Sequence, residues 1–290
     1  MNIKENFLLL MFTALFVLSC SKEKDTPLFT KNITIDASIN DLTRATDTDF
    51  EDDDIVGVYA WTGDNSVIAT PDKTDYTYSS SSSSWSSEDP LTWSDLTTDY
   101  YFMGVYPTRD ITDFTADNYT LDLSDQEASD LLIATNVESG LNGSRETPIP
   151  LVFVHSMAKL TINLTYKSEF LSTPTVESVE LSAGTTGTIN YLNKTVTLTG
   201  DPETISLPEV TANTQYASFM IPQTIEDINI NINGTTYTYS PDTAITLESG
   251  KNKVLNLVVG KDGEVSLTFS INSWIDDIDD GEALEIIGYH

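Results

Sequence analysis

The chain has 290 residues, with 14 Lys and Arg against 45 Asp and Glu, one Cys and two His. The formal net charge of -31 argues strongly against a nucleic-acid partner, because phosphate binding needs clustered cations. A single cysteine excludes a disulfide framework and a thiolate-rich metal site, and two histidines leave little for histidine-based catalysis. Hydrophobic residues at 39% nevertheless indicate a folded protein, long enough for two domains.

Residues 1–19 have the pattern of a signal peptide. Lys4 gives a charged start, and residues 7–18 are apolar apart from Thr13, which is too short a run to span a bilayer. Ser19-Cys20 closes the run and resembles the lipobox of bacterial lipoproteins, whose cysteine is diacylated and becomes the first residue. We therefore expect Cys20 to anchor the protein in the outer membrane. The alternative is an ordinary secretory signal.

The rest of the chain has the periodicity of β-strands. Between residues 33 and 39, Ile33, Ile35, Ala37 and Ile39 alternate with polar residues. Asn233-Gly234 predicts a type I′ hairpin between alternating runs at 228–232 and 235–239, and Asn193-Lys194 predicts a second between 188–191 and 195–198.

Later features complete the pattern. Apolar residues predict strands at 254–259 and 265–271, and the serine run 79–84 predicts a flexible hairpin loop. A cap at Ser124 with Glu127 three residues later predicts a short helix within 124–133. Pro148 and Pro150 stiffen a crossover where we place a domain boundary. Strands at such spacing indicate antiparallel sandwiches.

Several segments occur in an order that resembles the fimbrillin family, the lipoprotein pilins of type V pili. Besides the lipobox they are Thr43-Arg44-Ala45, Asp54 to Tyr59, Tyr101 to Pro107, Asp130 to Ala134, Leu151 to Leu160 and Ile271 to Trp274. The chain departs from the family pattern at Gly104, where a larger residue or Ala is frequent, and in the serine run. The resemblance covers nearly the whole mature chain.

The resemblance implies an all-β protein of two tandem transthyretin-like antiparallel β-sandwich domains, here residues 20–150 and 151–290. It also implies partners: other fimbrial subunits, joined head to tail after an arginine-directed surface protease removes the N-terminal strand, here 31–44. Arg44 is the sole basic residue between Asn32 and Asp72, so cleavage is expected between Arg44 and Ala45. The alternative is a loop arginine that pairs with the acids just downstream.

The C-terminal tail is a candidate donor strand for the next subunit. In Ala283 to Tyr289, Leu284 and Ile286 share one face of an extended strand, and Ile287 and Tyr289 share the other. Exposed apolar runs need a partner. The tail can equally be the last strand of its own domain, which would make this a tip or anchor subunit.

The sequence does not predict an enzyme or a cofactor. His155 lies in an alternating strand and is expected in the core or at the domain junction, His290 is the last residue, and there is no nucleophile elbow. The acid runs at 52–54 and 276–280 are expected to be solvated turns rather than Ca²⁺ sites. Thr243 follows a weak O-glycosylation pattern, Asp-Thr-Ala.

One alternative function stays open. A non-polymerising β-sandwich lipoprotein of the outer surface could bind glycans by stacking sugars on Trp61, Trp85 and Trp93, if these are exposed. The adhesion ligand itself, on a host or bacterial surface, is not indicated by any motif.

Overall fold

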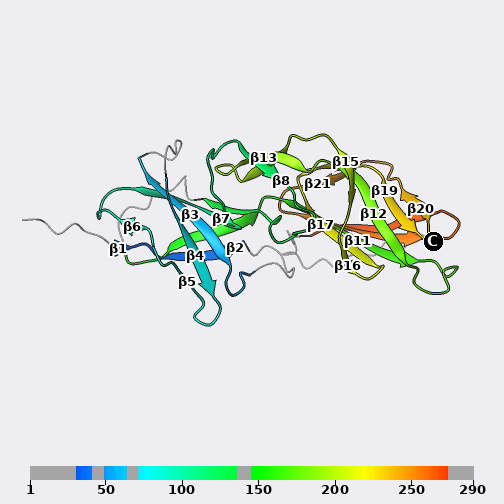
Figure 1. Cartoon of the computed structure of the whole chain (residues 1–290), viewed down its shortest axis with the longest axis horizontal. Coiled ribbons are helices and arrows are strands. Elements are labelled where there is room, and N and C mark those ends of the chain that lie inside the picture. The colour runs from blue at the N-terminus through cyan, green and yellow to red at the C-terminus, as the bar shows by residue number, and fades with distance from the viewer. Residues whose placement is uncertain (1–30, 41–48, 64–70, 136–144, 274–290) are drawn as a thin grey trace, which may run out of the picture.

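A computed structural model describes residues 31–40, 49–63, 71–135 and 145–273. The molecule is elongated, with the first-half strands toward one end and the second-half strands toward the other (Figure 1). The described residues form strands, turns and loops, and include no α-helix. They contain no helix long and apolar enough to span a membrane.

Most first-half strands belong to one seven-stranded sheet. Its order across the sheet is β2 (Ile35–Ile39), β10 (Ile149–His155), β9 (Leu132–Thr135), β7 (Tyr100–Tyr106), β3 (Ile55–Thr62), β4 (Asp72–Ser79) and β5 (Ser84–Ser86). A short separate pair joins β1 (Lys31–Asn32) to β6 (Thr92–Trp93).

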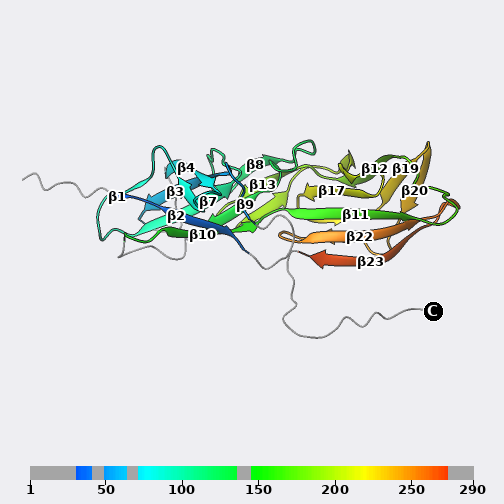
Figure 2. The same ribbon diagram turned by 90° about the horizontal axis from the view of Figure 1, so that it is seen from below.

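The second half is built around two larger sheets. One contains, in order, β16 (Glu209–Thr211), β17 (Gln215–Met220), β11 (Ala158–Tyr166), β22 (Asn252–Val259) and β23 (Val265–Ser273). The other contains β15 (Glu203–Ser206), β12 (Val176–Ala183), β19 (Ile228–Ile232) and β20 (Thr235–Tyr239), and β18 (Gln223–Ile225) pairs with β21 (Ile245–Leu247). Figure 2 shows β11, β22 and β23 side by side.

A hairpin from the second half reaches the first half. β13 (Thr186–Asn190) pairs with β14 (Thr195–Leu198) on one side and with β8 (Asp117–Thr120) on the other. Tyr191, just after β13, belongs to the same buried cluster as Tyr59 of β3, so apolar packing is continuous across the middle of the chain. The predicted division after Pro150 falls inside β10. The chain passes from the first sheet to the second at Ser156-Met157, between β10 and β11. We propose that the domain boundary lies at these two residues.

Both predicted hairpins are confirmed. β19 and β20 pair around Asn233-Gly234, whose φ angles of 50° and 73° suit a type I′ turn. β13 and β14 pair around Asn193-Lys194, where Lys194 has a φ of 57°. The serine run turns the chain from β4 into β5, and the strands predicted at 254–259 and 265–271 lie in β22 and β23.

The predicted helix within 124–133 is wrong. Residues 123–124 and 126–129 form two turns, and β9 begins at Leu132. The side chain of Asp122 accepts hydrogen bonds from the N–H and hydroxyl of Ser124, and Asp125 accepts one from the N–H of Ala128. Such local side-chain bonds satisfy the backbone donors without a helix.

The predicted antiparallel arrangement holds for all but two described strand pairs. β2 runs parallel to β10, and β11 runs parallel to β22. The centre of the first sheet is buried on both faces: along β3, Val56, Val58 and Ala60 join one apolar cluster, and Tyr59 and Trp61 join the other. This explains the continuous apolar run of β3.

Candidate functional site: the N-terminal strand and its groove

The first described segment fills an apolar groove. Ile33 and Ile35 are 1% and 5% exposed, and Ala37 and Ile39 are partly buried against the same cluster. The residues between them face solvent. The predicted alternation of the removable strand, Ile33 to Ile39, is therefore present, with its apolar side in the core.

Backbone bonds hold this segment along one side. In the parallel register Ile35 lies opposite Ile149, and Ile39 lies opposite Phe153. The N–H of Ile149 donates to the carbonyl of Thr34 (2.8 Å), and the N–H of Asn40 donates to that of Phe153 (2.8 Å). Within the described chain, β10 is the sole ladder partner of β2, so β2 is an edge strand.

Upstream of β2, the segment is tied to two other elements. The N–H of Ile33 donates to the carbonyl of Leu91 (2.7 Å), and the hydroxyl of Tyr76 in β4 donates to the carbonyl of Ile33 (2.9 Å). Burial raises the pKa of Tyr76 to about 12, so this hydroxyl stays protonated and remains a donor at neutral pH.

The groove floor explains one departure from the family pattern. A Cβ atom at Gly104 would lie 2.5 Å from the Cζ atom of Phe153, so only glycine leaves room for that ring. Phe50 packs edge-on against the rings of Phe153 (5.4 Å between centroids), Trp85 (4.9 Å) and Tyr106 (5.6 Å). Sequence reasoning missed Phe50, although a single aromatic residue among the acids at 47–54 indicates a side chain that packs into the core.

A buried arginine lies at the β1 end of the groove. Arg145 is 4% exposed, and its guanidinium carbon lies 4.0 Å from the ring centroid of Trp93. It donates to the carbonyls of Thr98 (2.6 Å) and Asp95 (3.3 Å). Lys31, opposite Trp93 in β1, forms a salt bridge of 2.6 Å with Glu146. A buried arginine has no periodic signature, and sequence reasoning missed it.

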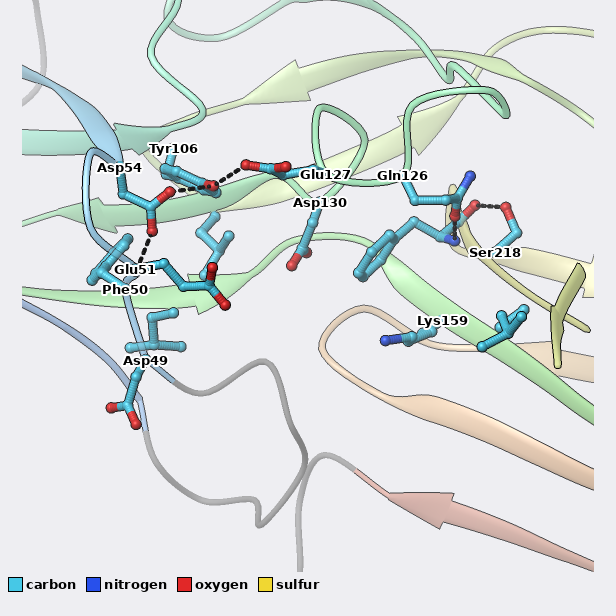
Figure 3. Close-up of a pocket in the computed structure, with 15 residues that line it drawn as sticks. Asp49, Phe50, Glu51, Asp54, Tyr106, Gln126, Glu127, Asp130, Lys159 and Ser218 are labelled. Atoms are coloured by element: carbon cyan, nitrogen blue, oxygen red, sulfur yellow. Dashed lines mark hydrogen bonds between the residues drawn. The ribbon is translucent and has the colours of Figure 1, made fainter. Parts of the chain in front are cut away.

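An acidic pocket of about 390 Å³ lies beside the end of β2 (Figure 3). Its wall includes Ile39, and the hydroxyl of Tyr106 donates to Asp54 (3.0 Å) and Glu127 (3.3 Å). Burial and the charge of Asp54 raise the pKa of Tyr106. Gln126 crosses from the first half and accepts a hydrogen bond of 2.8 Å from the N–H of Phe219 in β17. The pocket therefore marks the junction of the two halves.

The run Asp52-Asp53-Asp54 forms the turn before β3. Asp52 accepts bonds from the N–H (2.7 Å) and hydroxyl (2.9 Å) of Ser80, which lower its pKa. Asp54 accepts one from the N–H of Glu51 (2.6 Å). These carboxylates stabilise the turn and the serine hairpin. Among the described residues, no three His, Cys, Asp or Glu side chains are arranged to hold a metal ion.

Two other predictions concern His155, which is partly buried, and three tryptophans, which are buried. His155 lies at the end of β10, at the junction, and its Nδ1 atom lies 2.8 Å from Asp130. The junction position is as expected. The exposure required for glycan stacking is absent: Trp61, Trp85 and Trp93 are 7%, 9% and 2% exposed, because each fills one of the two cores.

Most remaining candidates lie outside the described residues. These are Cys20, Arg44, Ala45, His290, the acid run at 276–280 and the tail residues Leu284, Ile286, Ile287 and Tyr289. Thr243 is described, and lies exposed in a bend before β21. Its glycosylation stays a prediction.

Comparison with known proteins shows to which family the chain belongs. A family model described as fimbrillin-like matches residues 43–274. The chain belongs to the fimbrillin-like family. A sequence comparison with curated proteins gives no match.

Solved structures share this fimbrillin-like fold. A candidate cell adhesion protein from Bacteroides uniformis is 18% identical with a TM-score of 0.65, and the match covers 83% of this chain and 97% of that one. A second, from Bacteroides ovatus, is 17% identical with a TM-score of 0.65, covering 84% and 98%. The tip fimbrial protein Mfa3 from Porphyromonas gingivalis, truncated at its C-terminus, is 11% identical with a TM-score of 0.50, covering 84% and 99%.

Proposed function

We propose that this fimbrillin-like protein is a fimbrial subunit that assembles by protease-triggered strand exchange. It reaches the cell surface as an outer-membrane lipoprotein held by acylated Cys20. An arginine-directed protease cuts between Arg44 and Ala45, the segment 31–44 leaves, and a strand from the next subunit takes its place.

The placement of β2 carries this proposal. Among the described strands of its sheet it comes first in the sequence and pairs with β10 alone, so its loss breaks no other strand pair of that sheet. Its apolar side is nevertheless part of the core. Because this side is packed in the core while the other side faces solvent, removal of the strand leaves an apolar groove and an unpaired edge on β10.

The energies favour replacement over an empty groove. Burial of Ile33 and Ile35 contributes ~1.5–3 kcal/mol each, or about 3–6 kcal/mol together. That is a large part of the ~5–15 kcal/mol that stabilises a typical domain. A processed subunit with an open groove is therefore strongly driven to accept a strand, which supplies backbone hydrogen bonds and apolar side chains at once.

Strand donation of this kind produces a polymer. The accepting groove and the donated strand are different surfaces of the subunit, so the contact is head-to-tail and each addition exposes a new site. An unprocessed subunit keeps its own strand in place and stays a monomer.

The test replaces Arg44 in cells that produce the protein. Electron microscopy should show fibres containing the wild-type chain, and N-terminal sequencing of assembled subunits should read Ala45-Thr46-Asp47. Arg44→Ala should leave full-length monomers. Arg44→Lys is the matched control, because it keeps the charge but removes the side chain that an arginine-directed protease recognises, and it should block assembly equally. Fibres whose subunits all begin at Cys20 would contradict the proposal.

A further inference from the structure

The chain has three arginines, Arg44, Arg109 and Arg145. An arginine-directed protease that removed the N-terminal strand would destroy the subunit if it also cut after Arg109 or Arg145. Proteases cut where the backbone is exposed and free of fixed hydrogen bonds, or where it opens locally. The surroundings of the two later arginines therefore decide whether processing is selective.

Arg109 lies where a cut would ordinarily be expected. It is half-buried in residues 107–116, which link β7 to β8 without regular structure. The buried hydroxyl of Tyr59, in β3, donates to the carbonyl of Arg109 (2.6 Å) and accepts from the N–H of Ile111 (3.0 Å). This one oxygen thus fixes the backbone on both sides of residue 110. Burial raises the pKa of Tyr59, so the hydroxyl remains able to donate.

Side chains fix the same segment from the β4 side. The hydroxyl of Thr108 donates to Asp75 (2.5 Å), and Lys73 donates to Asp110 (2.9 Å). Hydrogen bonds therefore fix every residue from Thr108 to Ile111, on both sides of the peptide bond that follows Arg109. A protease that binds its substrate as an extended strand has to break these bonds first.

Arg145 is protected differently. Its guanidinium stacks on Trp93 at 4.0 Å, lies 5.8 Å from the ring centroid of Tyr100, and is bonded to the carbonyls of Asp95 and Thr98. At 4% exposure it cannot enter the specificity pocket of a protease without leaving this stack.

We infer that Tyr59 and the aromatic pair Trp93–Tyr100 are specificity determinants of the processing step: they make the bonds after Arg109 and Arg145 resistant in the folded subunit, so that cleavage is confined to Arg44. Selectivity then comes from the substrate's fold and does not require a protease with an extended sequence preference. This inference rests on the proposed function, because it assumes processing by an arginine-directed protease.

The test digests the full chain, purified in mild detergent, with an arginine-specific endoprotease and identifies the fragments by mass spectrometry. The folded wild type should be cut after Arg44 and not after Arg109 or Arg145. The denatured chain should be cut after all three, which shows that the acidic residues following Arg109 and Arg145 do not by themselves block the enzyme. Native cutting after Arg109 or Arg145 at the denatured rate would overturn the inference.

Two variants test the named residues. Tyr59→Phe should speed cutting after Arg109 about tenfold and leave Arg145 resistant. Trp93→Phe should speed cutting after Arg145 and leave the bond after Arg109 resistant. Tyr216→Phe is the matched control, because it removes another buried hydroxyl, bonded to Glu209 in the second half. If Tyr216→Phe speeds cutting after Arg109 as much as Tyr59→Phe does, the protection is global stability and Tyr59 has no specific role.

The outcomes separate the inference from the proposed function. If the folded chain resists cutting after Arg44 as well as after Arg109 and Arg145, the proposed processing is contradicted. The inferred protection of the bonds after Arg109 and Arg145 is then still supported. A chain cut at Arg44 and equally at Arg109 would preserve the processing and refute the inference. Melting curves of each variant confirm that the digested protein is folded.

Discussion

The hydroxyl of Tyr76 donates a hydrogen bond of 2.9 Å to the main-chain carbonyl of Ile33. Tyr76 is in β4, which does not pair with β2 in the sheet ladder, and its side chain is almost fully buried. The N-terminal segment is thus held by a polar contact from the opposite part of the groove as well as by β10. The hydrogen bond from Tyr76 and the burial of the Ile33 side chain can therefore be removed separately, by substituting one residue at a time.

Ile33→Ala should lower the free energy of unfolding by about 2–5 kcal/mol, because it removes a fully buried side chain and leaves a cavity. Denaturant unfolding measures the change. Thr34→Ala, at the neighbouring exposed position, is the control and should change stability by less than about 0.5 kcal/mol. Equal effects of the two substitutions would show that the segment is not seated in the core.

Alkaline pH should destabilise the fold through its buried tyrosines. Burial raises the pKa of Tyr76 to about 12, against ~10 in an unfolded chain. Between these values the unfolded chain loses a proton that the folded chain keeps, so stability falls as pH rises from about 10 to 12 and is unaffected below that range. Burial raises the pKa of Tyr119 and Tyr166 to about 12 as well.

The substitution Tyr76→Phe isolates the part of the alkaline destabilisation that comes from Tyr76. At pH 8 the variant should be less stable than wild type by about 1 kcal/mol, the net value of the hydrogen bond to Ile33. Toward pH 12 the gap should narrow, because the variant has no proton to lose at this position. Unfolding curves across the range measure it, and a gap that stays constant would contradict the assignment.

Cys20 should be acylated. Metabolic labelling with a fatty-acid analogue should mark the wild-type protein and sediment it with membranes, because a multiply acylated cysteine is a stable anchor. Cys20→Ala should lose both the label and the membrane fraction. Undiminished labelling of Cys20→Ala would place the lipid elsewhere or exclude it.

Deletion of residues 281–290 should decide the role of the tail. If the tail is a donor strand, the truncated protein should melt as wild type does but fail to extend fibres. Leu284→Asp with Ile286→Asp is the matched variant of full length and should fail in the same way. A large drop in melting temperature would instead show that the tail belongs to its own domain, as expected for a tip or anchor subunit.

Local sequence patterns predicted the features that depend on neighbouring residues. Alternation identified the buried face of Ile33 to Ile39, and Asn233-Gly234 identified a hairpin, because strand period and turn geometry are encoded within a few positions. The helix prediction failed for a related reason: the motif Ser124 to Glu127 also suits successive turns once Asp122 bonds to Ser124.

Features that join distant parts of the chain were not predictable in this way. Nothing near Ile35 indicates that its partner is Ile149 or that the pair is parallel. The bonds from Tyr59 to the backbone around Arg109, and the stacking of Arg145 on Trp93, likewise depend on side chains brought together by the complete fold. Each is recognisable only after the topology is known.

The parallel pairing of β2 with β10 also bears on the order in which the sheet is expected to fold. β2 lies near the start of the sequence, whereas β10 is the last strand of its sheet in the chain. Contacts of such sequence separation form late, because the intervening loop must be closed before they contribute. We therefore expect the other six strands to assemble first and the N-terminal segment to dock last. On this expectation, the strand that completes folding is the one that processing would take away, and a subunit awaiting its donor would have the same six-stranded sheet as a chain whose last folding step has not occurred.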